Sequence, residues 1–343
     1  MSTTLMATIP ATSAATSAAT LQLRVIEARC LNPLIRLIRL RADDGAALPG
    51  YSAGAHLRVQ VSLPDGRSDW RHYSLINLST QADATQAPTE YLIAVRREDE
   101  GRGGSRYMHQ QVQAGQLLTI EAPKNEFPLR EHAGCAVLVA GGIGITPLLS
   151  MAVQRLAQQA PVRLHYAGRS RALMAFLPEL QTLLGDALRL HTDAEAGAPL
   201  DVDALLDGCG AADQLYVCGP KPMLDTVLAK TQARGWTRER VHFEVFTAPA
   251  VEVGDHAFEL VLAQSGRSLT VPADRSILDV LIAAGCDPLF DCQRGECGVC
   301  AAPVLEGEID HRDYVLTGRE KNAGNVMQIC ISRCKGQRLV LDL

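Results

Sequence analysis

The chain has 343 residues, and its 33 basic and 38 acidic side chains give a formal net charge of −5 at pH 7. This length is enough for two or three domains with hydrophobic cores, so the fold does not need disulfide staples. The mild charge argues against a general nucleic-acid-binding protein. Because no segment has about 18 consecutive apolar residues, we expect no membrane span.

Residues 1–20 are rich in Ala, Ser and Thr, and they lack the basic start, the long apolar block and the twin arginine of an export signal. We therefore expect a disordered tail. The ten cysteines are spread along the chain, and several of them, such as Cys30 and Cys135, lie far apart in apolar segments. This usage is typical of a reduced intracellular protein, so we expect a cytoplasmic location.

The first folded segment, 21–130, alternates apolar and polar residues in short runs such as "LQLRVIEA", "HLRVQVSL" and "EYLIAVRR". Gly, Pro and Asp separate these runs. Alternation with frequent turn signals predicts an antiparallel β-barrel or sandwich, and we expect a barrel.

The rhythm changes over 131–246, where apolar strands such as "AVLVAG" and "QLYVCG" alternate with helical segments such as "PLLSMAVQRLAQQ" and "ALMAFLPELQTLL". This alternation indicates βαβ units and an α/β domain with a parallel sheet.

Small residues and Pro over 247–254 indicate a linker. The remaining residues, 255–343, predict a small α+β domain with strands "FELVLAQ" and "RSLTVPA" and a helix "SILDVLIAAG". From Asp255 onward there are 9 basic and 13 acidic residues, a balance of −4, so this last domain is a separate acidic unit.

The stretch "DCQRGECGVC" raises three possibilities: a disulfide framework, a zinc site or an iron–sulfur centre. The chain length argues against the first, and a zinc ribbon would need two C-x2-C pairs where only one is present. The C-x4-C-x2-C run with a distant fourth cysteine matches the plant-type 2Fe–2S spacing. The predicted ligands are Cys292, Cys297, Cys300 and Cys330. Gly295 and Gly298 would let backbone N–H groups turn toward the sulfurs.

Two other cysteines lie close to this run. Cys286 ends the predicted helix and Cys334 follows Cys330 by four residues. Neither fits the spacing, so we interpret both as small buried side chains.

The barrel contains "RHYSLIN", in which Arg71 offers a cation for a phosphate, Tyr73 a flat face for a ring and Ser74 a short hydroxyl. On its own this match is weak and fits an ordinary barrel strand. Downstream, "GRGGSRYMHQ" places Gly104 and Ser105 at the start of a helix, where backbone can approach a phosphate closely. A plain glycine turn would look the same.

The α/β domain opens with "VLVAGGIGITPLLSM", a strand, a glycine turn and a helix starting near Pro147. This geometry places a pyrophosphate on a helix N-terminus. The candidate binding residues are Gly141, Gly142, Gly144, Thr146 and Pro147. Because Thr146 and Pro147 stand where the third glycine of a Rossmann fingerprint would fall, a Rossmann dehydrogenase is the weaker interpretation. A second turn, "LYVCGPKPM", ends a late strand at Cys218, Gly219 and Pro220.

The strand "VRLHYA" ends without an Asp or Glu to bind a ribose hydroxyl. Arg169, Ser170 and Arg171 follow it and could hold the 2′-phosphate of NADPH, or they could be solvated loop residues. The residues alone leave the choice of nucleotide open.

Together these segments resemble a known family. "CQRGECGVC" and "MQICISRCKGQRLVLDL" look like the β-grasp-like ferredoxin domain at the C-terminal end of phthalate dioxygenase reductase and the vanillate demethylase reductases, and the resemblance runs from about residue 21 to the end. It implies FMN bound by Arg71, Tyr73, Ser74, Gly104 and Ser105, and NADH as the nucleotide. The two glycine turns resemble those of the ferredoxin–NADP reductase superfamily, in which the cysteine lies near the nicotinamide. By the same resemblance, Phe246 covers the flavin face.

The resemblance implies a reductase that passes electrons from NADH through FMN and a 2Fe–2S cluster to a Rieske-type terminal oxygenase, which hydroxylates or O-demethylates an aromatic acid in aromatic hydrocarbon catabolism. No residue needs to act as a covalent nucleophile. FMN is favoured over FAD because "EAPKNEFPL" passes almost directly into the α/β domain, with no extra segment for an adenine.

Two alternatives stay open. One is a stand-alone NADH:acceptor reductase, or diaphorase, acting on quinones, ferric chelates or cytochromes. The other is a redox-sensing iron–sulfur interaction protein with vestigial flavin and nucleotide sites, which the four intact motifs disfavour.

Overall fold

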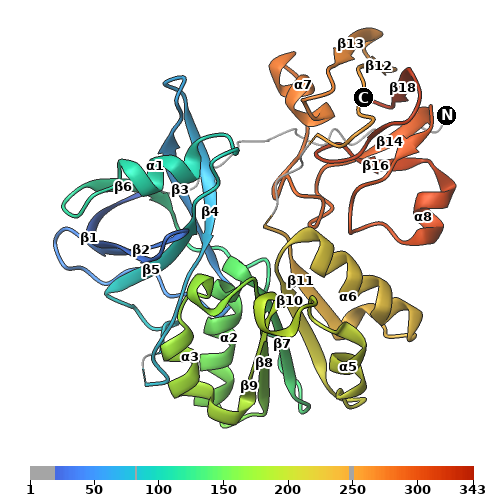
Figure 1. Ribbon diagram of the computed structural model, residues 1–343. Helices are drawn as coiled ribbons and strands as arrows, with labels where there is room; N and C mark the ends of the chain where they lie inside the picture. The colour runs from blue at the N-terminus through green and yellow to red at the C-terminus, as the bar shows by residue number, and fades with distance from the viewer. Residues whose placement is uncertain (1–19, 82, 247–250) are drawn as a thin grey trace, which may run out of the picture.

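The computed structural model describes residues 20–81, 83–246 and 251–343. The expected tail therefore lies outside the described residues except for Thr20, as do residues 247–250 of the expected linker. The chain forms three modules, each built on its own sheet (Figure 1).

The barrel module is a six-stranded antiparallel sheet in the order β4-β3-β6-β1-β2-β5. Its elements are β1 (Thr20–Asn32), β2 (Ile35–Ala42), β3 (His56–Ser62), β4 (Ser68–Ser74), β5 (Glu90–Arg96), α1 (Gly104–Gln110) and β6 (Leu117–Glu121). The sheet curls until the two end strands, β4 and β5, touch. Alternation along β3 buries Leu57, Val59 and Val61 in the barrel core, which confirms the expected antiparallel architecture.

The parallel-sheet module has five strands in the order β11-β10-β7-β8-β9, all paired in parallel. The strands are β7 (Ala136–Gly141), β8 (Val162–Gly168), β9 (Leu188–Thr192), β10 (Gln214–Cys218) and β11 (Val241–Glu244). The helices are α2 (Ile145–Ala157), α3 (Leu177–Leu184), α4 (Asp193–Ala196), α5 (Val202–Asp207) and α6 (Lys221–Ala233), with 3-10 turns η1 (Gly142–Gly144), η2 (Arg171–Leu173), η3 (Gly185–Ala187) and η4 (Arg238–Arg240).

Helices cover both faces of this sheet. Side chains of α2 and α3 join the apolar cluster on one face, and those of α5 and α6 join the cluster on the other. Every residue of the central strand β7 is therefore buried, as parallel sheets require. The helix expected over 172–184 is shorter than predicted and begins at Leu177. Pro178 occupies its first turn, where a fixed φ suits a helix start, and Phe176 precedes it in the left-handed region at φ 59°.

The C-terminal module is a mixed five-stranded sheet in the order β13-β12-β18-β14-β16, plus the pair β15-β17. Its elements are β12 (Phe258–Leu262), β13 (Arg267–Val271), α7 (Ile277–Ala283), β14 (Ala301–Glu306), β15 (Ile309–Asp310), α8 (Gly318–Ala323), β16 (Val326–Gln328), β17 (Arg333–Cys334) and β18 (Arg338–Leu341). The two expected strands and the helix form β12, β13 and α7. Ser276 and Asp279 make a reciprocal capping box that fixes the start of α7.

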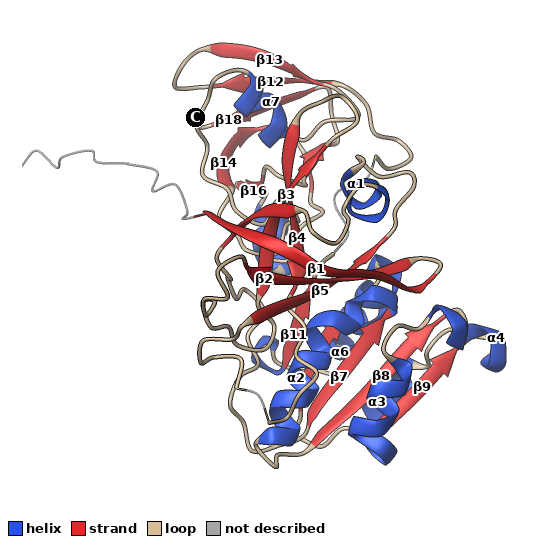
Figure 2. Ribbon diagram, turned by 90° about the vertical axis from the view of Figure 1, so that its left-hand side faces the viewer, coloured by secondary structure: helices blue, strands red, loops and turns tan. Residues whose placement is uncertain are grey.

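The modules meet in two different ways. One continuous apolar cluster contains Leu37 and Phe127 from the barrel side and Leu138 and Leu148 from the parallel-sheet module, so these two modules share a core. The C-terminal module has a core of its own. Figure 2 shows its strands stacked beyond the barrel, at the end of the molecule away from β7, β8 and β9. Within the described residues, no helix is both long and apolar enough to cross a membrane.

Candidate electron-transfer site

The cysteine loop, residues 291–300, connects α7 to β14 and brings the four predicted cluster ligands together. The Cys292 sulfur lies within hydrogen-bonding reach of Cys297 and Cys330, and the Cys300 sulfur within reach of Cys330. Among the described residues no three His, Cys, Asp or Glu side chains surround a point suited to one metal ion. The close approach of all four sulfurs fits a 2Fe–2S cluster, in which four thiolates hold two bridged irons.

The backbone of the cysteine loop turns its N–H groups toward sulfur. Gly295 and Gly298 have φ values of +76° and +80°, which residues with a side chain rarely adopt. The Arg294 N–H donates to Cys292 Sγ at 3.3 Å. A Cβ on Gly295 would lie 2.7 Å from Ile331 Cγ2, so this position also has no space for a side chain. Donors of this kind stabilise the negative charge of a bound cluster.

The two remaining cysteines of this region make other contacts. Cys334 Sγ donates to the Arg338 carbonyl at 3.3 Å, and Cys286 Sγ lies 3.5 Å from an Arg267 guanidinium nitrogen. Cys334 is buried in the core of the C-terminal module, as expected, whereas Cys286 is only partly buried against it.

The two barrel motifs that were expected to bind a phosphate touch each other. A Cβ on Gly104 would lie 2.7 Å from Arg71 Nε, so the glycine turn before α1 lies directly against the arginine on β4. Arg71 Nη1 donates to Asp69 and to the Trp70 carbonyl, whereas Nη2 is buried with no partner among the described residues. Ser74 Oγ is likewise buried and unpartnered there. Two orphaned polar atoms in one motif fit a site that receives a polar ligand.

The other residues of the barrel motifs have different surroundings. Tyr73 packs against the barrel core, and burial raises the pKa of its hydroxyl. The Ser105 hydroxyl donates to the Glu98 carbonyl at 3.2 Å and accepts from the Glu98 N–H at 2.9 Å, so it braces the loop before α1.

The two glycine turns of the parallel-sheet module lie side by side at the carboxyl ends of β7 and β10. A Cβ on Gly144 would lie 2.1 Å from the Cys218 carbonyl oxygen, and one on Gly219 would lie 3.0 Å from the Gly141 Cα. Gly142, at φ +56°, has open space beside it. Because β8 and β10 flank β7 on opposite sides, this point is where the strand order reverses, the usual ligand position in such sheets.

The helix α2 begins at Ile145, two residues before the predicted Pro147, and its first turn includes Thr146. Thr146 Oγ1 donates to the Ile143 carbonyl at 3.0 Å. In the second turn Cys218 is fully buried, and Pro220 directly precedes α6.

The loop after β8 exposes Arg169 and partly buries Ser170. Arg171 pairs with Glu195 at 2.6 Å, so its guanidinium already has a carboxylate partner. Of the two arginines considered for a 2′-phosphate, Arg169 is therefore the better placed.

A charged junction joins the three modules, and the sequence patterns did not identify it. Its members are Arg294 and Glu296 of the cysteine loop, Glu244 at the end of β11, and His56 and His72 on the barrel. Arg294 Nη2 lies 2.8 Å from Glu296 Oε1, and both side chains are about nine-tenths buried. Glu296 Oε2 accepts from the Val245 N–H at 2.7 Å.

Burial dominates the pKa values at this junction. It raises the pKa of Glu244 to about 8, although Arg294 opposes the shift. Burial and the Arg294 cation lower the pKa of His56 to about 4 and of His72 to about 3. Both histidines are thus neutral at pH 7. The sequence signalled this junction only through charged residues inside other motifs. Glu244 lies in the apolar run "VHFEVF", and Arg294 and Glu296 lie in the cysteine-rich run "DCQRGECGVC".

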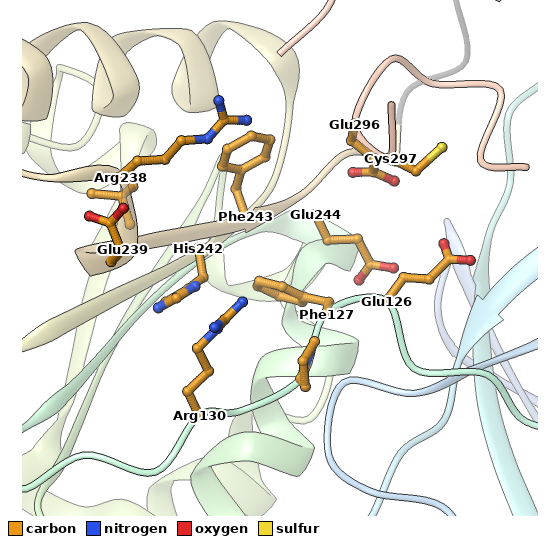
Figure 3. A pocket seen from close by; sticks show the side chains of 12 residues that line it. Glu126, Phe127, Arg130, Arg238, Glu239, His242, Phe243, Glu244, Glu296 and Cys297 are labelled. Carbon is orange, nitrogen blue, oxygen red and sulfur yellow. The ribbon is translucent and has the colours of Figure 1, made fainter. Parts of the chain in front are cut away.

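A cavity of about 360 Å³ opens beside the junction (Figure 3). The carboxylates of Glu126, Glu244 and Glu296 lie at the end near Cys297, and Arg130 and His242 lie at the other end. Phe246 is half-buried and packs against the core shared by the barrel and parallel-sheet modules.

Comparison with known proteins identifies two of the modules. Residues 260–335 match the 2Fe-2S iron-sulfur cluster binding domain, and residues 138–229 match the oxidoreductase NAD-binding domain. The chain is 41% identical over 323 residues to the heme-dependent oxidative N-demethylase beta subunit of Ectopseudomonas mendocina, covering 94% of this chain and 99% of the relative. It is 40% identical over 313 residues to the vanillate O-demethylase oxidoreductase of a Pseudomonas species, covering 90% and 95%.

Among solved structures, phthalate dioxygenase reductase superposes with a TM-score of 0.71 at 37% identity, over 94% of this chain and 98% of that chain. It is described as a modular structure for electron transfer from pyridine nucleotides to a 2Fe–2S centre. The order of modules, the family matches and the relatives agree with the resemblance seen in the sequence. The chain belongs to the phthalate dioxygenase reductase and vanillate demethylase reductase family, as the flavin- and 2Fe–2S-dependent reductase component of an oxygenase system.

Proposed function

We propose that this reductase takes hydride from NADH onto FMN and passes electrons singly through a 2Fe–2S cluster to a Rieske-type terminal oxygenase that acts on an aromatic acid. The observation that carries the proposal is the contact of the cysteine loop with both other modules. Glu296 Oε2 accepts a hydrogen bond of 2.7 Å from the Val245 N–H at the end of β11, and Asp291 of the loop lies within hydrogen-bonding reach of Glu126 on the barrel side. Electrons therefore need to cross no further module between the nucleotide and the cluster.

The barrel residues have separate roles in this proposal. When bound, the flavin accepts two electrons from a hydride and returns them one at a time. Arg71 Nη2 would donate to the flavin phosphate, Ser74 Oγ would bind the polar edge of the ring, and Tyr73 would support its face. Gly104 keeps the phosphate turn against Arg71, and Ser105 holds that turn in place through Glu98.

FMN is favoured over FAD because the segment between Glu121 and Ala136 has no helix that could form an adenine site. Asn125 in this segment binds the Ser52 hydroxyl at 2.7 Å and the Ala53 carbonyl at 2.9 Å, which ties the segment to the barrel. Acid-released flavin compared with standards tests this choice, and stoichiometric FAD would refute it.

NADH would bind at the carboxyl ends of β7 and β10. Gly141, Gly142 and Gly144 would admit the pyrophosphate, while Thr146 and Pro147 form the first turn of the helix behind them. The nicotinamide would be bordered by Cys218, Gly219 and Pro220. The adenosine ribose would lie near Arg169 and Ser170. Phe246 would cover the flavin face. Arg169 and Ser170 can also accept a 2′-phosphate, so comparison of NADH with NADPH as electron donor tests the assignment.

The cluster would be held by Cys292, Cys297, Cys300 and Cys330, with the N–H groups of the cysteine loop around it. We place the functional units at 21–130, 131–246 and 255–343, with a linker over 247–254 between the second and the third. The ten cysteines all lie in the described residues and none of them forms a disulfide, which supports a reducing, cytoplasmic location.

The partner is tested by mixing the reductase with a purified Rieske-type O-demethylase oxygenase and its aromatic substrate. We expect NADH oxidation coupled to product. Because the C-terminal module has a balance of −4, we expect added salt to slow this coupled reaction, while reduction of ferricyanide, itself an anion, does not slow in parallel. Rapid quinone reduction without oxygenase turnover would instead support the stand-alone reductase.

A further inference from the structure

The side chain of Glu296 bridges two modules. One carboxylate oxygen pairs with Arg294 of the same loop at 2.8 Å, and the other accepts from the backbone N–H of Val245, 51 residues away in sequence. Figure 3 shows Glu296 extending from the cysteine loop toward the end of β11. A hydrogen bond to a charged acceptor of this kind is among the stronger ones in proteins.

The residue that Glu296 holds lies just beyond the last sheet pair of β11. β11 is an edge strand, and its last paired residue is Glu244, opposite Cys218. Val245 is 4% exposed, so its N–H has no ready access to water. Without Glu296 this donor would be buried and unpaired, a state that native proteins rarely tolerate. The cysteine loop therefore supplies the hydrogen-bond acceptor for the first residue beyond β11.

Phe246 follows Val245 directly and packs against the core shared by the barrel and parallel-sheet modules. A backbone anchor at Val245 limits how far the Phe246 ring can move. In the proposed function this ring covers the flavin and must move aside when nicotinamide arrives. The anchor thus acts on the step at which nicotinamide gains access to the flavin.

Arg294 offsets the free-energy cost of burying the Glu296 carboxylate. Glu244 and Glu296 are two carboxyl groups in one nearly dry junction, and a buried carboxylate requires a neighbouring cation. Arg294 supplies that cation from within the same loop, so both partners of the ion pair belong to the C-terminal module.

We propose that Glu296 is a positioning residue that couples docking of the iron–sulfur module to the placement of Phe246, and so sets how easily nicotinamide reaches the flavin. The inference rests on the proposed function for the role of Phe246 alone; the bridge itself is a property of the chain. Loss of the bridge would free the strand end and make displacement of the ring easier. NAD⁺ would then bind more tightly.

The test compares the full-length wild-type protein with Glu296→Ala, Glu296→Gln and a control, Tyr314→Phe. The control removes a different hydrogen bond of the same interface, that of the Tyr314 hydroxyl with Asp225 at 3.0 Å. Hydrogen exchange at the Val245 amide reports the bridge, and calorimetric titration with NAD⁺ reports nicotinamide access. Absorbance of the iron–sulfur centre verifies an intact cluster.

We expect Glu296→Ala to speed Val245 exchange and to tighten NAD⁺ binding by about fivefold, the equivalent of one ordinary hydrogen bond. Glu296→Gln, which retains an amide oxygen as acceptor, should recover most of both effects, and Tyr314→Phe should change neither. If Glu296→Ala loses its cluster, Val245→Pro removes the same hydrogen bond from outside the cysteine loop and should also tighten NAD⁺ binding.

Unchanged Val245 exchange in Glu296→Ala, or faster exchange with unchanged NAD⁺ affinity, would overturn the inference. If the protein bound no flavin, the proposed function would fail, while the exchange data would still report whether Glu296 holds the strand end. The two failures are therefore distinguishable.

Discussion

The hydroxyl of Tyr314 donates to a carboxylate oxygen of Asp225 at 3.0 Å, and this bond joins the C-terminal module to helix α6 of the parallel-sheet module. Arg238 adds a bond of 2.6 Å to the Val315 carbonyl and one of 3.1 Å to the Tyr314 carbonyl. These polar bonds and the edge-on contact of the Tyr314 ring with Phe243 link two separate cores, whereas the other two modules share one core. Polar interfaces of this kind separate more readily than hydrophobic ones.

We therefore predict that a chain ending at Ala250 folds, binds flavin and reduces ferricyanide with NADH, because the first two modules keep their common core. It should not support the oxygenase, since it lacks the cluster that delivers single electrons. Flavin content, ferricyanide reduction and coupled oxygenase turnover are the measurements. Oxygenase turnover at the full-length rate would show that the cluster is not an obligatory relay.

Replacement of Cys297 by Ser should abolish the visible charge-transfer bands of the cluster and the EPR signal of the reduced protein, because one thiolate ligand is lost. Reduction of the flavin by NADH should persist. Cys286→Ser and Cys334→Ser are the matched controls, as these sulfurs contact Arg267 and Arg338 instead of the other ligands. Cluster loss in either control, together with a harmless Cys330→Ser, would contradict the ligand assignment.

Gly144→Ala should destabilise the protein by about 1–3 kcal/mol, the usual range for overpacking, since the new Cβ would sit 2.1 Å from the Cys218 carbonyl oxygen. NAD⁺ affinity should fall as well, because the two glycine turns would separate. Urea unfolding and NAD⁺ titration measure these effects. Gly318→Ala, at the start of α8 with open space around it, should leave both unchanged. Equal behaviour of the two variants would refute the tight contact between the turns.

Glu244→Gln should change how stability depends on pH. The folded pKa of Glu244, about 8, lies above the ordinary value of 4.5, so the folded state binds this proton more tightly than the unfolded state does. The contribution of Glu244 to the free energy of unfolding should thus be fully present below pH 4.5 and be lost as pH rises through 8. Burial is the main cause; Arg294 opposes the shift, and Glu296 and Glu126 add to it.

Between pH 6 and pH 9 the stability of Glu244→Gln relative to wild type should therefore increase, on the order of 2 kcal/mol. Urea unfolding at the two pH values measures the difference. Glu239→Gln, at an exposed carboxylate close to β11 in sequence, is the control and should show no such increase. A relative stability that stays constant with pH would show that Glu244 does not titrate in this range.

Local patterns in the sequence were enough to predict the three modules, the four clustered cysteines and the glycine turns. Period-two alternation predicted the barrel strands, alternating strands and helices predicted the parallel sheet, and the spacing of Cys292, Cys297 and Cys300 predicted a 2Fe–2S centre. Each of these signals is contained in a short stretch, where covalent geometry and side-chain alternation restrict the backbone. The start of α3 was the exception, because Phe176 adopts a left-handed conformation that no local pattern indicated.

Only the tertiary structure decided the relations between modules. Gly104 lies against Arg71 and Gly144 against Cys218 because the fold superposes turns that are distant in sequence. Glu244, Arg294 and Glu296 form one buried junction for the same reason, and their partners lie up to 51 residues apart. From its local sequence alone, a charged residue is expected to be exposed to solvent. Its burial, its shifted pKa and its hydrogen bond to another module arise only when the modules pack and exclude water from the charge.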